Sequence, residues 1–421
     1  MKALIVGSGG REHALARTLL QSPQVERVFC SPGNGGTATM ANCQNLPLAV
    51  DDFVGIADAV EEHNLDLVVV GPEVPLSLGI TDYLRAKNIA VFGPTKQGAQ
   101  IESSKSWAKN IMTLANVPTA KSQTFDDANS AKAYIETEGA PIVIKADGLA
   151  AGKGVIVAMT LTDAVAAVDE LLGDEPGKLV IEEYLTGAEV SVLAVTDGKT
   201  IRPLSPAQDH KRIGEGDTGK NTGGMGAYSP VPLVTDELMD EIEQQVLQPT
   251  LKALNSKNID YRGVLYAGLM ITPQGEPKVI EFNCRFGDPE TQAVLPLLDT
   301  PLDEILLACV EQRLEQLPPI KYKAGSAVCV VAASGGYPDA YEKGKEISGI
   351  DRAESKGAIV FHAGTKLERD RVITNGGRVL GITAVGADFD KAIAIAYDAV
   401  NSIEFDQIYY RRDIGHRYKQ K

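Results

Sequence analysis

Residues 264–292 read VLYAGLMITPQGEPKVIEFNCRFGDPETQ, and this stretch decides how the rest of the chain is organised. The apolar run Val264–Ile271 is followed by a turn rich in proline and glycine and then by the alternating run Lys278–Asn283. Two runs of this kind around a Gly/Pro turn are typical of a β-hairpin. The sequence therefore predicts two antiparallel strands, the second of which ends in a group of polar residues.

The polar residues at the end of this hairpin predict a ligand site. Because successive side chains on a strand face opposite sides, we expect Glu281 and Asn283 to point into a cleft while Ile280 and Phe282 pack in a core. A carboxylate and a carboxamide are hard oxygen ligands that suit Mg2+ better than zinc. The planar guanidinium of Arg285 can donate paired hydrogen bonds to an anion. We interpret the set as a nucleotide-triphosphate site. The alternative is a solvated strand face that ends in a polar turn.

Length and composition restrict the class of protein. A chain of 421 residues is too long for one core and suggests three or four units. Hydrophobic residues make up 44% and charged residues 23%, which is the balance of a soluble globular protein. The formal net charge of −15 argues against a nucleic-acid or acidic-membrane surface. Phosphate groups must then be held by local lysines, arginines and backbone amides.

The cysteines and the first residues indicate the compartment. The chain has 5 cysteines without a CxxC pair, so we interpret them as reduced thiols of a cytoplasmic protein. The start, MKALIVGSGG, predicts a strand that enters a glycine turn and not a secretory leader. No apolar run reaches about 18 residues, so we expect no membrane span.

The first hundred residues predict a doubly wound parallel sheet. Four short apolar runs each end in glycine-rich sequence, with helical spacers between them: Lys2–Val6, Val28–Cys30, Leu67–Val70 and Ile89–Phe92. Loops at the carboxyl edge of such a sheet bind ligands, and a glycine turn that opens a helix is an anion site. The turn Gly7–Gly10 and the loop 33–36 are the candidates. The alternative is that these glycines only turn the chain.

A second region predicts a flap over phosphate groups. The strands Pro141–Lys145 and Val155–Ala158 flank a loop of small residues at 146–154 whose amides could wrap phosphate oxygens. The pattern is neither a Walker A motif nor a kinase glycine loop. Burying Lys145 unpaired costs several kcal/mol, so we expect an anionic partner for it. An exposed flexible hairpin is the alternative.

Two further segments complete the pattern. Residues 208–230 form the longest predicted loop, which is too long for an idle connection and includes the small-residue run 222–226. From Gly325 onward the chain predicts an α+β cap with little catalytic chemistry. The basic turn Arg411–Gly415 near the end is expected to face the active cleft.

Four segments together resemble the glycinamide ribonucleotide synthetase family of ATP-grasp ligases: GSGGREHA at 7–14, PGNGG at 32–36, KADGLAAGKG at 145–154 and RFGDPETQ at 285–292. The resemblance covers essentially the whole chain, and the last block is its most specific part. It implies an α/β and α+β multidomain protein: an N-terminal doubly wound domain (1–102), a central ATP-grasp domain (103–122 and 191–325), an inserted lid (123–190) and a C-terminal cap (326–421).

The resemblance also implies an enzyme and its reaction. ATP phosphorylates the carboxylate of glycine, the amine of 5-phosphoribosylamine attacks the acyl phosphate, and glycinamide ribonucleotide, ADP and phosphate are released in an early step of purine synthesis. Phosphoryl transfer needs positioning and charge neutralisation more than an acid–base dyad. The implied cofactors are ATP and Mg2+ (or Mn2+). We expect a cytoplasmic monomer with these small-molecule substrates and without nucleic-acid or membrane partners.

The resemblance implies a role for each site residue. Arg285, Asp209 and Lys211 are the implied catalytic residues near glycine, and Glu281 and Asn283 the implied metal ligands. The implied ATP site comprises Lys105, Lys145, Gly148, Gly152, Lys153, Gly154, Glu182, Leu185 and Glu189. The implied substrate site comprises Gly7, Gly9, Gly10, Gly33, Asn34, Gly35, Thr222, Gly223 and Gly224.

Three other functions remain open at this point. One is a different ATP-grasp ligase that acts on a purine intermediate, against which the 285–292 block argues. Another is a nicotinamide-dependent oxidoreductase; position 12 is Glu12 where the dinucleotide fingerprint needs glycine, and no acidic residue ends the second strand. The third is a nucleotide sensor without turnover. The first hairpin strand carries no carboxylate, so a second metal site also stays open.

Overall fold

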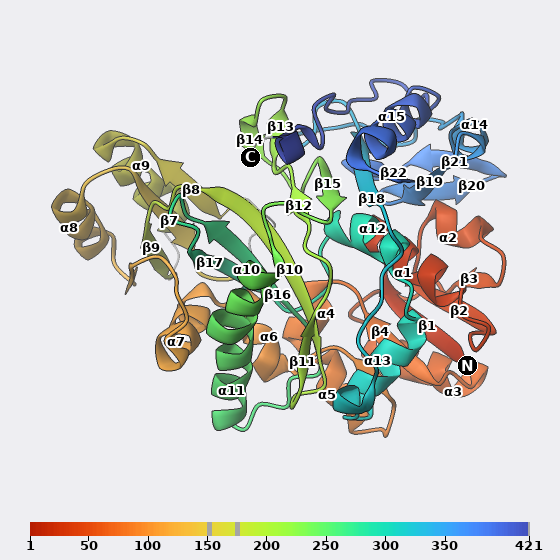
Figure 1. Ribbon diagram of the computed structural model, residues 1–421, viewed down its shortest axis with the longest axis horizontal. Coiled ribbons are helices and arrows are strands. Elements are labelled where there is room, and N and C mark those ends of the chain that lie inside the picture. The colour runs from red at the N-terminus through yellow and green to blue at the C-terminus, as the bar shows by residue number, and fades with distance from the viewer. Residues whose placement is uncertain (150–153, 173–176, 420–421) are drawn as a thin grey trace.

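The computed structural model describes residues 1–149, 154–172 and 177–419. Its first unit is a sheet of five parallel strands in the order β3-β2-β1-β4-β5 with helices on both faces (Figure 1). Residues 3–6 of β1 are fully buried, because a central parallel strand is covered on both sides. This confirms the doubly wound sheet. The elements are β1 (Lys2–Gly7), β2 (Arg27–Pro32), β3 (Cys43–Asn45), β4 (Leu67–Val70), β5 (Val91–Phe92), α1 (Gly10–Leu19), α2 (Gly35–Thr39), α3 (Phe53–His63), α4 (Glu73–Leu78), α5 (Ile80–Arg85) and α6 (Lys96–Ser103).

The second unit is small and has an apolar core of its own, built around Ile135, Ile144, Val168 and Ile181. It is an antiparallel sheet in the order β6-β9-β7-β8, and in Figure 1 it projects at the left edge of the molecule. The helix α7 leads into it from the first unit. The elements are α7 (Lys105–Ala115), β6 (Ser122–Phe125), α8 (Ala128–Glu138), β7 (Ile142–Ala146), β8 (Val155–Ala158), α9 (Leu161–Leu172) and β9 (Leu179–Glu183).

The predicted hairpin is present as β16 (Gly263–Ile271) and β17 (Pro277–Asn283). It forms one side of a four-stranded sheet, β11-β10-β16-β17. The register shifts between Gly268, which pairs with Glu281, and Leu269, which pairs with Val279, so one residue of β17 is bulged. The remaining elements are β10 (Ala188–Thr196), β11 (Ile201–Pro203), α10 (Asp236–Ile242), the π-helix η1 (Glu243–Leu247), α11 (Gln248–Ser256), α12 (Glu290–Val294), η2 (Leu295–Leu297), α13 (Leu302–Val310) and η3 (Leu314–Gln316).

The bulge corrects the simple alternation expected along this strand. Glu281 and Asn283 do face a cavity, but Ile280 is only half-buried and lies on the cavity wall instead of in the core. Phe282 is 3% exposed and packs in the core as expected. A strand with one extra residue no longer places every second side chain on the same face.

The third sheet joins distant parts of the chain in the order β12-β15-β18-β22-β19. Its first two strands come from the segment predicted as a long loop, so that prediction is wrong in part. The segment is rich in glycine and polar residues and lacks the alternation of apolar and polar side chains that marks a strand. Its strand β15 pairs with β18, which lies about a hundred residues further along the chain. The elements are β12 (Gln208–Asp209), β13 (Arg212–Gly214), β14 (Thr218–Asn221), β15 (Gly226–Ser229), β18 (Ser326–Ala333), α14 (Ile350–Ser355), β19 (Ala358–His362), β20 (Thr365–Glu368), β21 (Arg371–Thr374), β22 (Arg378–Gly386), α15 (Phe389–Val400) and η4 (His416–Lys419).

The basic turn near the end supports this segment from behind. Arg411 is fully buried and forms ion pairs with Asp217 at 3.0 Å and Asp413 at 2.7 Å. Arg417 donates to the backbone oxygen of Asp209 at 3.0 Å. None of the residues 411–415 lines the cavity, so the expectation that this turn faces the cleft is wrong. The turn instead fixes the position of β12 and the β13–β14 hairpin.

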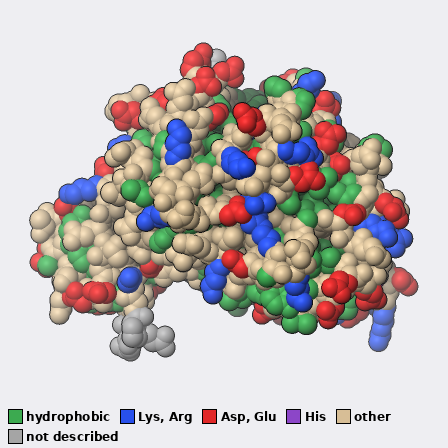
Figure 2. Space-filling model, turned by 90° about the horizontal axis from the view of Figure 1, so that it is seen from below, with side chains coloured by type: hydrophobic (Ala, Val, Ile, Leu, Met, Phe, Trp, Pro, Cys, Tyr) green, Lys and Arg blue, Asp and Glu red, His purple; other side chains and the backbone are tan. Residues whose placement is uncertain are grey.

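Charges of both signs are scattered over the face that Figure 2 shows, without a large region of one sign. In the part of the chain that the structure describes, no helix is long and apolar enough to cross a membrane.

We predict that Arg411→Ala loosens the segment 208–221. Loss of Arg411 leaves Asp413 without a guanidinium and Asp217 with that of Arg417 alone, which costs about 2–3 kcal/mol after allowance for their partial exposure. Hydrogen–deuterium exchange should accelerate in this segment, and the thermal midpoint should fall. The neighbouring Arg412 is exposed, so Arg412→Ala is the matched control. Equal effects of the two substitutions would contradict the structural role of Arg411.

Candidate active site

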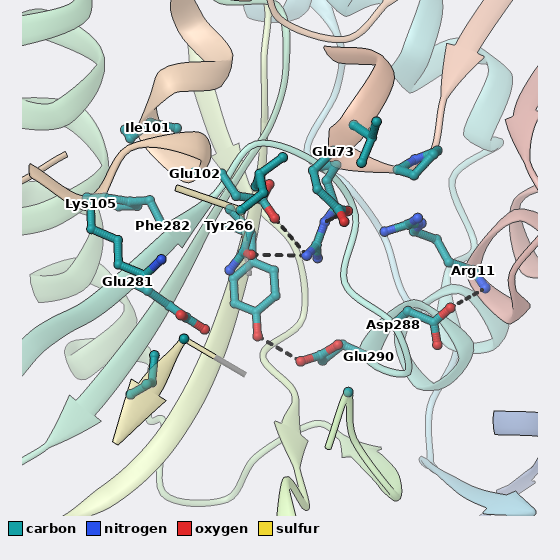
Figure 3. A pocket seen from close by; sticks show the side chains of 18 of the residues that line it. Arg11, Glu73, Ile101, Glu102, Lys105, Tyr266, Glu281, Phe282, Asp288 and Glu290 are labelled. Carbon is teal, nitrogen blue, oxygen red and sulfur yellow. Dashed lines mark hydrogen bonds and ion pairs between the residues drawn. The ribbon is translucent and has the colours of Figure 1, made fainter. Parts of the chain in front are cut away.

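A cavity of about 730 Å3 lies where the units meet, a size that suits a ligand site. Its wall takes residues from the carboxyl edge of the first sheet, from the lid strands, from β17 and the turn after it, and from the third sheet. In Figure 3, Lys105 and Glu281 lie on one side of the cavity, and Arg11 and Asp288 lie on the other. The cavity therefore has two chemically different ends.

The end below the lid is rich in lysine. Lys105 donates to the backbone oxygen of Gly148 at 2.8 Å, and burial lowers its pKa. Lys145 forms an ion pair with Glu182 at 3.0 Å, and Lys109 lies 3.4 Å from the same carboxylate. The anionic partner that the sequence required for Lys145 is thus present within the protein. Two lysines share one glutamate, which leaves net positive charge at this end of the cavity.

The other residues predicted for ATP are placed differently. Gly148, Gly154 and Glu182 line the cavity together with the two lysines Lys105 and Lys145. Leu185 and Glu189 do not line it, and the carboxylate of Glu189 accepts from Lys211 at 2.9 Å. Gly152 and Lys153 lie outside the described residues. Five of the residues predicted for ATP therefore meet at the cavity, Lys105 from α7 and the other four from the described part of the lid.

The predicted metal ligands stand side by side at the end of β17. The side chain of Glu281 is 42% exposed, and the nearest cation is Lys211 at 4.0 Å. The amide oxygen of Asn283 accepts from Arg285 at 3.1 Å. Among the described residues, no group of three His, Cys, Asp or Glu side chains could hold a metal. The donor set therefore fits a hard cation that takes its remaining ligands from phosphate oxygens and water.

Arg285 lies between two carboxylates from the first unit. It forms ion pairs with Glu102 at 2.8 Å and with Glu73 at 3.3 Å. Burial raises the pKa of Glu102, although Arg285 opposes the shift. For Glu73, Arg285 and Arg11 outweigh burial and lower the pKa. The guanidinium is thus held rigidly, and its charge is already balanced within the protein.

A group of buried polar side chains lies next to the metal pair. Glu290 accepts hydrogen bonds from Tyr266 at 2.7 Å and from Ser191 at 3.3 Å, and Figure 3 shows its carboxylate directed at the Tyr266 hydroxyl. Asp209 also lines the cavity, and burial raises its pKa to about 7. Lys211 faces the same space, and its pKa is raised by Glu189 and Asp209 despite its burial. Asp209, Lys211 and Arg285 thus meet in one cavity.

The backbone amides of the N-terminal glycine turn already donate hydrogen bonds to carboxylates of the protein itself. Gly9 donates its amide to Glu12 at 2.5 Å, and the amide of Arg11 donates to Asp288 at 3.1 Å. A Cβ added at Gly7 would lie 2.6 Å from the side chain of Glu12, so only glycine leaves room for this carboxylate. Gly7 and Gly9 line the cavity, whereas Gly10 is buried outside its wall.

The loop 33–36 is not part of the cavity wall. The side chain of Asn34 caps α2 by accepting from the amide of Gly36 at 2.9 Å. Gly35 donates to the Thr365 hydroxyl at 3.1 Å, so the loop contacts the C-terminal region. The loop nevertheless contacts the N-terminal glycine turn, because Gly33 donates to the Gly7 oxygen at 3.2 Å and the Asn34 side chain donates to the Ser8 oxygen at 2.9 Å. Thr222 and Gly223 do line the cavity, while Gly224 packs against Pro289 outside its wall.

Several cavity residues were not predicted. The turn GDPE lies within the block 285–292 that carries the resemblance, but no role for its residues followed from the sequence alone. The C-terminal region was expected to carry little chemistry, yet Tyr337 and Arg378 lie on the wall; Arg378 pairs with Asp288 at 3.4 Å. No local pattern marks these residues. The unpredicted wall residues include Arg11, Glu12, Glu73, Glu102, Lys109, Tyr266, Asp288, Glu290, Tyr337 and Arg378.

Comparison with known proteins agrees with this geometry. Three family models of phosphoribosylglycinamide synthetase match the chain: the N domain at residues 1–102, the ATP-grasp (A) domain at 103–291 and the C domain at 327–417. The chain is similar to a phosphoribosylamine–glycine ligase of Nostoc sp., with 63% identity over 99% of both chains. A relative of the same name from Synechocystis sp. is 59% identical over 99% of this chain and 100% of the relative.

A solved structure extends the comparison to the fold. The phosphoribosylamine–glycine ligase of Thermotoga maritima superposes with a TM-score of 0.83 at 32% identity, and the match covers 99% of this chain and 100% of the other. The family matches and the high identity of full-length relatives agree with each other and with the cavity. The chain belongs to the phosphoribosylglycinamide synthetase family.

Proposed function

We propose that this protein is an ATP-dependent ligase that joins glycine to 5-phosphoribosylamine and releases glycinamide ribonucleotide, ADP and phosphate, a step of purine biosynthesis. One observation carries the proposal: Glu281, Asn283 and Arg285 follow one another at the end of a single strand and face one cavity with Lys105 and Lys145. Family membership supports the identity of the substrates.

The residues suit a reaction in two stages. A carboxylate is a poor electrophile, so transfer of the γ-phosphoryl group to glycine supplies a leaving group. The lysines Lys105 and Lys145 lie where the charge of a triphosphate needs neutralisation. The amine of the second substrate then attacks the acyl carbon, and the carbon–oxygen bond to phosphate breaks. Positioning and charge serve both stages, because no side chain must act as a covalent nucleophile.

Mg2+ or Mn2+ is part of the proposal. Glu281 and Asn283 would hold the ion, which when bound would neutralise the β- and γ-phosphate oxygens. The carboxylate of Glu281 is partly exposed to the cavity, and its nearest cation is Lys211 at 4.0 Å, so its oxygens remain accessible to an ion. Arg285 would orient Asn283 through their hydrogen bond at 3.1 Å.

The second substrate belongs at the end away from the lysines. The glycines Gly7 and Gly9, the residues Thr222 and Gly223, and the cations Arg11 and Arg378 lie there. A ribose phosphate needs hydrogen-bond donors and positive charge, and the two arginines, which pair with Glu12 and Asp288, offer their remaining N–H groups. The backbone of Gly223 lies against the guanidinium of Arg378, whose Nη1 donates to the Gly223 oxygen at 2.6 Å. We place the phosphate group beside these residues.

We also propose the domain division 1–102, 103–122 with 191–325, 123–190 and 326–421, a cytoplasmic location and a monomeric state. The separate apolar core of the unit around α8 and α9 supports its treatment as a lid. Gel filtration with light scattering tests the monomer.

The proposed function is tested by ADP release in a mixture of Mg2+-ATP, glycine and freshly generated 5-phosphoribosylamine, with each component omitted in turn. The ligase requires all three for release. Release without phosphoribosylamine would indicate another acceptor or an idle ATPase. Binding of ATP without release would indicate a sensor, and consumption of a reduced nicotinamide would indicate an oxidoreductase.

We predict that Glu281→Gln lowers kcat by about 100-fold or more while the fold is kept. The amide cannot supply the negative charge that a divalent ion needs, and the side chain already faces the cavity. Calorimetry should show weaker Mn2+ binding in the presence of an ATP analogue. Glu276 is exposed on the turn of the same hairpin, so Glu276→Gln is the control. Near-normal turnover of Glu281→Gln at saturating Mg2+ would refute the ligand assignment.

We predict that Lys145→Ala raises the KM of ATP by about 10-fold or more and that of glycine by less than about threefold. The substitution removes a cation at the triphosphate end and leaves Glu182 with Lys109 as its one remaining lysine partner, so the positive charge facing phosphate falls. Steady-state kinetics with each substrate varied in turn measures both values. Equal losses for ATP and glycine would indicate a role in lid closure instead.

A further inference from the structure

Two cysteines of the first unit lie against each other at the edge of its sheet. Cys30 in β2 and Cys43 in β3 belong to neighbouring parallel strands, and the register places both side chains on the same face (Figure 1). Their sulfur atoms are 3.8 Å apart, and a disulfide needs about 2.05 Å. The strand β3 has only 3 residues and is the edge of the sheet, so it is held on one side and can move by this amount.

The two thiols differ in access and acidity. Cys30 is fully buried, whereas Cys43 is partly exposed. The hydrogen bond from Cys30 lowers the pKa of Cys43, against the effect of burial. The same hydrogen bond, burial and the nearby charge of Glu12 raise the pKa of Cys30. Because the thiolate is the nucleophile in thiol–disulfide exchange, Cys43 is the attacking group and Cys30 is the partner that closes the bond.

The other cysteines lack these properties. Cys284, Cys309 and Cys329 are at most 1% exposed. Burial raises the pKa of each of these thiols. Buried cysteines of this kind are inert toward disulfide reagents. Reaction with a disulfide reagent is therefore expected at the edge of the first sheet and not in the rest of the protein.

The cysteine pair is connected to the predicted substrate loop 33–36 through Asn45. This residue follows Cys43 by two positions on β3. Its side chain accepts a hydrogen bond from the Thr37 hydroxyl at 2.8 Å and donates one to the backbone oxygen of Asn34 at 2.9 Å. A Cβ on Gly33 would lie 2.2 Å from Oδ1 of Asn45. The loop and β3 therefore fit closely, and a shift of β3 displaces the loop.

The loop in turn contacts the cavity wall. Gly33 donates its amide to the Gly7 oxygen at 3.2 Å, and the Asn34 side chain donates to the Ser8 oxygen at 2.9 Å. Gly7 and Ser8 both line the cavity. A shift of β3 is thus transmitted to the end of the cavity away from the lysines.

We propose that Cys30 and Cys43 form a reversible modification site. A low-molecular-weight disulfide, such as oxidised glutathione, converts the pair to an intramolecular disulfide that weakens binding of the second substrate. The effect on that substrate rests on the proposed function, whereas the formation of the disulfide does not. A reducing compartment keeps such a pair as thiols, so the site responds to oxidising conditions.

The exchange proceeds by two displacements. The Cys43 thiolate attacks one sulfur of oxidised glutathione, forms a mixed disulfide and releases a glutathione thiolate. Cys30 then gives up its proton and attacks the Cys43 sulfur, and the second glutathione leaves. The protons of both cysteine thiols end on the two glutathione thiols. The cysteine pair loses two electrons, and the glutathione disulfide gains them.

The direct test treats the full-length wild-type protein with an excess of oxidised glutathione under native conditions. The protein is then unfolded, its remaining thiols are alkylated, and the peptides are mapped by mass spectrometry. Cys30 and Cys43 should appear as one disulfide-linked pair without bound glutathione. The three buried cysteines should be alkylated. Reduction with dithiothreitol should restore both thiols of the pair.

Variants separate the two displacements. Cys30→Ala should retain glutathione on Cys43, because no second thiol displaces it. Cys43→Ala should leave Cys30 unmodified. Cys309→Ala is the matched control, since Cys309 on α13 is a buried thiol that is not among the described residues of the cavity wall. This variant should form the disulfide as the wild-type protein does.

Oxidation should also change the kinetics selectively. The kcat/KM for phosphoribosylamine should fall by about tenfold or more, because a small displacement of a positioning loop is costly. The KM of ATP should stay unchanged, since the lysine end of the cavity does not contact this loop. Hydrogen–deuterium exchange should accelerate in residues 33–45. Dithiothreitol should reverse each change.

Several results would overturn the inference. Free thiols at Cys30 and Cys43 after treatment of the wild-type protein would refute the site, and so would glutathione retained on wild-type Cys43 in place of the pair. A complete disulfide with unchanged kinetics for phosphoribosylamine would refute the link to the loop. Failure of the proposed function is distinguishable, because the reduced protein would then release no ADP with all three components although peptide mapping still reports the disulfide.

Discussion

The structure of the site depends on the buried guanidinium of Arg285. It joins Glu73 at the start of α4, Glu102 near the end of α6 and Asn283 at the end of β17. Two segments of the first unit are thereby fixed to the end of a strand that lies about two hundred residues further along the chain. The pair with Glu102 is largely buried and the pair with Glu73 is partly exposed, and removal of the guanidinium would leave both carboxylates without this partner. The metal pair and the carboxyl edge of the first sheet keep their relative positions through this one side chain.

Charge is sorted along the cavity. Lysines gather below the lid around Glu182, carboxylates occupy the middle, and Arg11 and Arg378 lie at the far wall, where they pair with Glu12 and Asp288. Such an order matches a reaction with a polyanion at one end, an amino acid in the middle and a phosphorylated amine at the other end. The net charge of the chain is −15, so local sorting and not the overall field selects these ligands.

The sequence predicted the parts of the fold that local patterns encode. The strands β1 and β4 are short apolar runs before glycine, and β17 shows alternating apolar and polar side chains next to a turn. Each of these patterns lies within about ten consecutive residues. The strands β12 and β15 were not predicted, because their ladder partner β18 is remote and their own sequence is polar. The bulge at Ile280 depends on pairing with β16, which alternation alone does not reveal.

The candidate site was predictable to a similar extent. Glu281, Asn283 and Arg285 were predicted because they are spaced two apart at and just after the end of a predicted strand. Asp209 and Lys211 were predicted from the family resemblance. Arg378 and Tyr337 escaped notice, since only the tertiary fold brings the C-terminal region to the cavity. The loop 33–36 has the glycine content of a ligand loop but serves contacts with Thr365. Its role in substrate binding stays a prediction.

The central claim is that the carboxylate of glycine is activated by phosphorylation within this cavity. The most direct measurement follows oxygen from glycine labelled with 18O in its carboxylate. An acyl phosphate requires that one labelled oxygen leaves with the phosphate, so mass spectrometry should find one 18O in each inorganic phosphate released and the other in the amide product. ADP formation with unlabelled phosphate would contradict the claim, because ATP would then have been cleaved by water.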